Sequence, residues 1–326
     1  MIFLDPYNPK IVSAKNSHAD KILPIVLERV DDLPNGELKD FLNEFRIRRI
    51  LTDLPDRLDG HHQDWLRTIS TLNIAEWEDY LRIKKKWARN RLNPEKRLLA
   101  KYITVVNEIN SIFKYTGAFA NKKTLYSTYD LAENLNVNTC VYCNRVYTKT
   151  VIKPKKVTRP EFDHWFPKET YPLLALSFYN LIPSCHICNS STKTTTIMNT
   201  RDYLHPYLPE NTDISFSYWI ESINKYCFHI KRPFPSKEHN TIIAFKLEEI
   251  YETHTDEIHD LVRLRKLYSV DYLLKLKGLL STVDNNVSME ELYRLAFGTH
   301  VEEKNFIKRP LSKMKRDILK ELGIIS

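Results

Sequence analysis

The chain has 326 residues, more than one typical domain, and its 42% hydrophobic and 28% charged residues are typical of a folded protein rather than a disordered one. Only 6 glycines occur, which argues against a turn-rich all-β architecture and against a glycine-rich phosphate loop. The 49 Lys and Arg against 41 Asp and Glu give a formal charge of +8, a weak indication of affinity for polyanions. No signal peptide and no long apolar run is evident, so we expect a cytoplasmic protein without a membrane partner.

Residues 1–134 are predicted to form a helical N-terminal region. The segment 37–51, "ELKDFLNEFRIRRIL", has the apolar spacing of an amphipathic helix. Further along, helical spacing continues on both sides of Pro94, which should end one helix or begin the next. The stretch 82–101 carries nine Lys or Arg and one acid. These charges indicate either a solvated helix face or a face that contacts phosphates.

Residues 135–207 differ from the helical region because cysteines, aromatic residues and prolines interrupt the periodicity. Two pairs of cysteines, in "CVYC" and "CHIC", have the CxxC spacing of metal-binding knuckles. Four thiolates satisfy tetrahedral Zn²⁺ and leave no coordination position for water, so the predicted zinc is structural. A fifth cysteine, Cys227, is interpreted as a small core residue. The predicted zinc ligands are Cys140, Cys143, Cys185 and Cys188.

Between and beside the knuckles stand residues that phosphodiester hydrolysis requires. The neutral imidazole of His164 is suited to take the proton of an attacking water. Asp163 and Asn189 would supply oxygen ligands to a hard cation, Mg²⁺ or Mn²⁺, that stabilises charge on the phosphate. Asn180 is predicted to hold the imidazole in its productive orientation. The sequence therefore predicts a structural zinc and a second, catalytic metal.

A basic segment lies between the first knuckle and this acid–base pair. Residues 144–160 carry six Lys or Arg and no acid. We interpret them as nucleic-acid contacts, with surface solvation as the alternative. Lys193 either touches phosphate or lies on the surface. The predicted substrate-binding residues are Arg145, Lys155, Lys156, Arg159 and Lys193.

Residues 208–326 are predicted to form a C-terminal β-hairpin and helical region. The stretches "DISFSYWI" and "YCFHI" alternate apolar and polar residues and are joined by a short polar link, which indicates a hairpin. From Phe245 onward the pattern is helical again. The segment 304–320 carries seven Lys or Arg and one acid.

Taken together, "CVYC…FDHWFPK…FYNLIPSCHICNSSTK" resembles the HNH endonucleases, the zinc-knuckle type of ββα-metal nuclease. The resemblance covers about residues 138 to 205. It implies a β-hairpin that carries Asp163, the metal-binding acid, and His164, the general base, followed by a helix that carries Asn189. Asn180 matches the central asparagine, whereas Asn189 replaces the second histidine of the motif.

Within that family, "YPLLALSFYNLIPSCHICN" resembles the HNH subunits of Septu and retron-associated anti-phage systems. That resemblance implies a bacterial defence role and an ATPase partner subunit. The fold class we expect is α+β, a predominantly helical chain with an embedded zinc-stabilised nuclease module and a C-terminal hairpin with helices. The function we expect is metal-dependent cleavage of DNA, with RNA as the alternative substrate. The alternative is a non-catalytic zinc module that binds nucleic acid or a partner.

Overall fold

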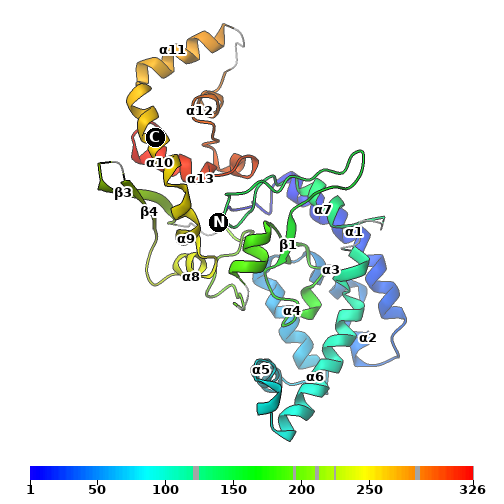
Figure 1. The fold of residues 1–326 in the computed structure, drawn as a ribbon. Coiled ribbons are helices and arrows are strands. Elements are labelled where there is room, and N and C mark those ends of the chain that lie inside the picture. The colour runs from blue at the N-terminus through cyan, green and yellow to red at the C-terminus, as the bar shows by residue number, and fades with distance from the viewer. Residues whose placement is uncertain (120–124, 194–195, 210–212, 224, 283–286, 326) are drawn as a thin grey trace.

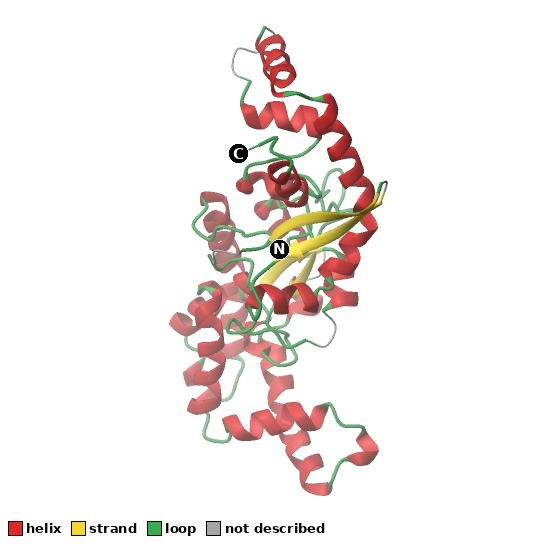
Figure 2. Ribbon diagram, turned by 90° about the vertical axis from the view of Figure 1, so that its left-hand side faces the viewer, coloured by secondary structure: helices red, strands yellow, loops and turns green. Residues whose placement is uncertain are grey.

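The computed structural model describes the chain except for residues 120–124, 194–195, 210–212, 224, 283–286 and 326. The fold is mixed, with many helices and two small antiparallel sheets, so the α+β class is confirmed. Helices of the first third of the chain form one end of an elongated molecule, and helices of the last third form the other end (Figure 1). The strands lie at mid-height between these two helical ends (Figure 2).

Helix α1 contacts α3, α6 and α7, while α4 contacts α2 and α5, and α5 contacts α6. Pro94 stands in the first turn of α6, so the prediction that it begins a helix is confirmed. The helices are α1 (Pro9–Asp31), α2 (Glu37–Phe41), α3 (Glu44–Thr52), α4 (Pro55–Thr68), α5 (Ile74–Lys84), α6 (Asn93–Ile112) and α7 (Thr128–Leu135).

The single helix predicted over residues 37–51 is wrong. The chain forms two helices there, because Asn43 interrupts the run and its side chain accepts a hydrogen bond from the backbone N–H of Arg46 at 3.0 Å. That bond is an N-cap, which starts α3 in a new direction. Phe45, which the pattern placed on the apolar face, is exposed.

Two strands lie between the cysteine knuckles and two follow them. Strands β1 (Glu161–His164) and β2 (Leu181–Ser184) are antiparallel, with Asp163 opposite Ile182 and His164 opposite Leu181. A short helix, η5 (Ile187–Thr192), follows β2. The predicted C-terminal hairpin is confirmed as β3 (Ser215–Ser222) and β4 (Lys225–Lys231).

Cys227 lies in β4 and is half-exposed rather than in the core, and its thiol donates to Glu221 Oε2 at 3.2 Å. The prediction that Cys227 is a core residue is therefore wrong. Helix α13 packs against β3, where Asp317 accepts a hydrogen bond from the backbone N–H of Phe216 at 3.1 Å. The later helices are α8 (Lys237–Ala244), α9 (Leu247–Tyr251), α10 (Thr255–Leu267), α11 (Val270–Ser281), α12 (Met289–Phe297) and α13 (Ser312–Glu321).

Both ends of the described chain return to the first cysteine knuckle. The backbone N–H of Ile2 donates to Val141 O at 2.8 Å, and the side-chain amide of Asn144 donates to Phe306 O at 2.9 Å. Buried apolar side chains from all three predicted regions form one continuous cluster. The segment that carries the knuckles is therefore supported from both sides. Among the described residues, no helix combines the length and apolar character that crossing a bilayer requires.

Candidate metal centre and acid–base pocket

The four knuckle cysteines converge on one point. Their Sγ atoms all lie within 4.8 Å of one another, all four residues are buried, and none forms a disulfide. Thiolates that bind Zn²⁺ tetrahedrally at 2.3 Å would lie about 3.8 Å apart. The distance from Cys143 Sγ to Cys185 Sγ is 4.0 Å. The cluster therefore fits a zinc ion, as predicted from the spacing.

The hairpin places Asp163 and His164 next to this cluster. Tyr142, between the first two cysteines, donates its hydroxyl to Asp163 Oδ2 at 2.6 Å. Tyr142 is fully buried, and its ring stacks on Phe245 with centroids 4.2 Å apart. The first knuckle and β1 are thus joined directly, so a metal in the knuckles would fix the position of the acid–base pair.

His164 is held by its Nε2 atom, which lies 3.0 Å from the carbonyl oxygen of Ala175. A carbonyl only accepts, so Nε2 carries the proton and Nδ1 keeps its lone pair. Burial of the imidazole lowers the pKa of His164 to about 4, which makes the neutral form dominant at pH 7. Nδ1 has no hydrogen-bond partner in the described part of the chain. The ring can therefore accept a proton there.

Asn180 is fully buried and cross-links the loop between β1 and β2. Its Oδ1 accepts from the N–H of Phe166 at 2.6 Å, and its Nδ2 donates to Phe166 O at 3.1 Å and to Leu174 O at 2.8 Å. Both amide protons are used, so the expected direct bond from Asn180 to the imidazole is replaced by the one from Ala175 O. Asn180 acts on His164 through the loop that carries Ala175.

Asp163 and Lys193 form a buried ion pair. Their side chains are 7% and 6% exposed, and Lys193 Nζ lies 2.6 Å from Asp163 Oδ2. The ammonium also donates to His164 O at 2.8 Å and Trp165 O at 3.1 Å. Burial lowers the pKa of Lys193 from its ordinary value, and Asp163 opposes that effect. All three ammonium protons point to protein oxygens, so the expected phosphate contact of Lys193 is replaced by a structural role.

Asn189 bonds to a residue that the sequence reasoning missed. Its Nδ2 donates to Glu161 Oε2 at 2.8 Å, and His186 Nδ1 lies 2.9 Å from Glu161 Oε1. Glu161 stands two residues before Asp163 in β1, and alternation along a strand puts such residues on the same face. That spacing is the signal that could have identified it.

One pocket of about 540 Å³ brings most of these side chains together. We call it the His164 pocket. Tyr115 also lies there: its ring is edge-on to the imidazole, with centroids 4.6 Å apart. No spacing in the sequence links it to the motif. The lining of the His164 pocket includes Tyr115, Arg159, Glu161, Asp163, His164, Lys168, Glu169, Asn189 and Lys193.

The predicted substrate-binding residues are scattered. Arg159 lines the His164 pocket. Lys156 instead pairs with Asp130 of α7 at 3.2 Å, and Arg145 lies 3.4 Å from His254 Nε2, outside the pocket. Lys155 is exposed and makes no ion pair in the part of the chain that is described. Of the five predicted residues, Arg159 is the one that remains a candidate for contact with a phosphate at this pocket.

The donors around His164 fit a hard cation only in part. Asp163, Asn189 and Glu161 offer oxygen atoms to the same pocket, but the charge of Asp163 is already balanced by Lys193. Among the described residues, the four cysteines are the one group of three or more His, Cys, Asp or Glu close enough to share a metal. Asp163 as a metal ligand stays a prediction, whereas Glu161 and Glu169 are pocket carboxylates without an ion pair to Lys or Arg among the described residues.

Comparison of the chain with protein-family models, with curated proteins and with solved structures gives no match. What the site can do therefore follows from its own geometry.

Proposed function

We propose that the chain is a metal-dependent endonuclease of the HNH type that hydrolyses phosphodiester bonds in nucleic acid. The observation that carries this is the state of His164: a neutral imidazole, fixed through Nε2 by Ala175 O, with Nδ1 unpaired at a pocket that also holds carboxylates, an amide and Arg159. The free position of Nδ1 and the neutral ring at pH 7 are what a general base requires, while the lowered pKa reduces its affinity for the proton.

In the proposed reaction, His164 Nδ1 takes a proton from a water molecule as its oxygen attacks phosphorus. The P–O bond to the leaving sugar oxygen breaks, and that oxygen takes a proton from solvent water to leave as a hydroxyl group. Arg159 is placed to attract the phosphate. Glu161, Asn189 and the second oxygen of Asp163 would hold a divalent cation. Such a cation neutralises charge on the phosphate and leaving oxygen. The local order of β1, β2 and η5 supports the proposal, because Asp163 and His164 lie in the first strand of a hairpin and Asn189 lies in the short helix that follows it.

The test compares purified wild type with His164→Ala in Mg²⁺ or Mn²⁺, on supercoiled plasmid, linear duplex, single-stranded DNA and RNA. His229→Ala is the matched control, because His229 lies on the exposed side of β4, outside the pocket. We expect wild type and the control to cleave equally and His164→Ala to be slower by about 10²-fold or more. Zinc content measured on all three proteins shows whether the fold is retained. Equal cleavage by His164→Ala would overturn the assignment of the base.

A second candidate function is favoured by one observation. The Asp163–Lys193 ion pair neutralises a carboxylate that a catalytic metal would otherwise use. A zinc-stabilised module that binds nucleic acid without cutting it would need no such metal. Binding that persists in EDTA, with no cleavage of any of the four substrates, would support this alternative and contradict the nuclease.

A further inference from the structure

A second pocket, of about 330 Å³, lies beside the His164 pocket between α5, α6 and the loop after β1. We call it the α6 pocket. It shares Tyr115, Lys168 and Glu169 with the His164 pocket. Ala175 lines it as well, and the carbonyl oxygen of this residue holds the imidazole. The two pockets are therefore neighbours, and Tyr115, Lys168 and Glu169 lie between the α6 pocket and the candidate base.

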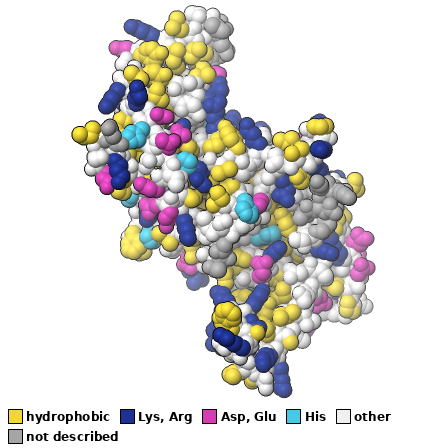
Figure 3. Space-filling view, viewed as in Figure 1, with side chains coloured by type: hydrophobic (Ala, Val, Ile, Leu, Met, Phe, Trp, Pro, Cys, Tyr) yellow, Lys and Arg dark blue, Asp and Glu magenta, His cyan; other side chains and the backbone are white. Residues whose placement is uncertain are grey.

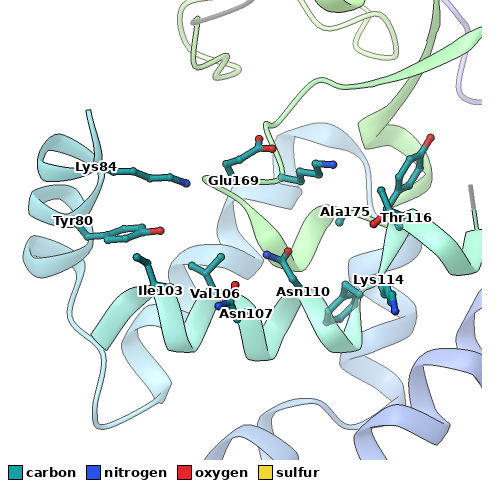
Figure 4. A pocket seen from close by; sticks show the side chains of 13 residues that line it. Tyr80, Lys84, Ile103, Val106, Asn107, Asn110, Lys114, Thr116, Glu169 and Ala175 are labelled. Atoms are coloured by element: carbon teal, nitrogen blue, oxygen red, sulfur yellow. The ribbon is translucent and has the colours of Figure 1, made fainter. Parts of the chain in front are cut away.

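The lining of the α6 pocket combines cations with amides. Asn107 and Asn110 are three residues apart and project from one side of α6, and Asn110 points into the pocket (Figure 4). Lys84 extends across it from α5 toward Glu169 (Figure 4). Neither asparagine amide has a hydrogen-bond partner in the described part of the chain. Unpaired amides and a free ammonium are donors and acceptors left open for a ligand.

Charge in the α6 pocket favours an anion. The lining contains three lysines, Lys84, Lys114 and Lys168, and one carboxylate, Glu169. None of the three lysines makes an ion pair within the described residues. Amide side chains read base edges, and lysines contact phosphates. Apolar walls, to which Ile103 and Val106 contribute, would accept the faces of bases.

The positive charge continues beyond Lys84 onto the α5–α6 arm, defined as residues 74–112. Three of its basic residues are paired: Arg82 with Asp79, Lys86 with Glu95 and Lys101 with Glu76. Lys and Arg side chains gather at this end of the molecule (Figure 3). Those without an ion pair in the described chain are Lys84, Lys85, Arg89, Arg91, Lys96 and Arg97.

An aromatic side chain stands among these cations. Trp87 is 74% exposed at the turn between α5 and α6, and the guanidinium carbon of Arg89 lies 5.7 Å from its ring centroid. An exposed tryptophan beside an arginine is a surface on which an unpaired base stacks. In a duplex the bases are already stacked on one another, so the tryptophan would find no free base face.

From these observations we infer that a single-stranded nucleic acid runs along α6, from the arm at Trp87, through the α6 pocket, to His164. The inference rests on the proposed function for the bond that is cut, but the binding path is a separate claim. The lysines hold the backbone, Asn107 and Asn110 contact base edges, and Trp87 stacks on a base at the outer end.

The test measures binding by fluorescence anisotropy with the full-length chain in EDTA, so no cleavage is needed. The probes are labelled 15-nucleotide single strands of DNA and of RNA and a 15-base-pair duplex. The variants are Lys84→Glu combined with Asn110→Leu, and separately Trp87→Ala. The control is Lys21→Glu, which makes the same charge change on an exposed residue of α1, outside both pockets.

We expect the double variant to bind single strands at least tenfold more weakly than the control, and Trp87→Ala severalfold more weakly. The salt dependence of binding should also become shallower in the double variant. Preference for the RNA or the DNA strand identifies which of the two is the ligand. The binding path would be contradicted if the double variant and the control bound single strands equally. It would also be contradicted if the duplex bound more tightly than both single-stranded DNA and single-stranded RNA. If single strands bind as expected but wild type cleaves none of them, the binding path is supported and the nuclease proposal is contradicted.

Discussion

Lys193 Nζ and Asp163 Oδ2 lie 2.6 Å apart in an environment that excludes nearly all solvent. The ammonium is held by the same carboxylate that the sequence suggests as a metal ligand. Because Lys193 directly follows η5, the pair links β1 to the end of this helix, close to the cysteine knuckles.

We expect removal of one partner of this pair to be costly. Lys193→Met or Asp163→Asn leaves a buried charge without its counterion, which should lower the free energy of unfolding by about 3–5 kcal/mol. The double variant should lose clearly less than the sum of the two. Urea unfolding of the four proteins measures the coupling. Additive losses would show that the two side chains do not stabilise each other.

Glu161 should dominate the affinity for a divalent cation at the His164 pocket, because it lies beside Asn189 and has no Lys or Arg ion pair among the described residues. Glu161→Gln is expected to raise the Mn²⁺ concentration needed for half-maximal binding by tenfold or more, as followed by electron paramagnetic resonance. Glu108→Gln, on the exposed face of α6, should leave Mn²⁺ binding unchanged. Unaltered binding by Glu161→Gln would place the cation elsewhere.

One Zn²⁺ per chain is expected, held by the four cysteines. Cys185→Ser should lower the zinc content measured by inductively coupled plasma mass spectrometry and expose the segment between the knuckles to limited proteolysis, since metal binding supplies folding free energy. Cys227→Ser keeps all four ligands and is the matched control. Full zinc content in Cys185→Ser would contradict the four-thiolate site.

Stability should fall on acidification partly because of His18. This residue is fully buried, with Nε2 2.8 Å from Leu176 O, and burial lowers its pKa to about 4. The unfolded chain binds a proton near pH 6.5 that the folded chain does not, so stabilisation is complete above pH 6.5 and is lost toward pH 4, by about 3 kcal/mol.

His18→Gln removes this titration but keeps a donor for Leu176 O. Urea unfolding at pH 7.5 and pH 4.5 should show a smaller drop for the variant than for wild type. Zinc loss at low pH affects both proteins alike and cancels in the comparison. Identical drops would contradict the assignment.

Features governed by local spacing were predictable from the sequence. The CxxC spacing brings each pair of cysteines together locally, and the need of Zn²⁺ for four ligands predicted that the two pairs meet. Pro94 marked a helix start, and alternation marked the β3–β4 hairpin, for the same reason. Trp165 and Phe166 pack in the core as expected of large aromatic residues.

Features that depend on the path of the chain were not predictable. Whether Lys193 faces solvent or Asp163 is decided by how the segment after η5 folds back on β1. Tyr115 reaches His164 from 49 positions away along the chain, and the carbonyl of Ala175 carries no side-chain signal at all. The break at Asn43 shows that one capping side chain can override an apolar pattern.

Helix α6 has 20 residues and so spans about 30 Å. The ring that touches the imidazole of His164 follows its last turn closely, and the basic turn with Trp87 precedes its first. A helix of this length behaves as a stiff rod, so a tilt imposed at one end displaces the other. Tyr115 and Trp87 therefore lie near opposite ends of one helix, which fixes the spacing between the candidate base and the exposed tryptophan at roughly its length.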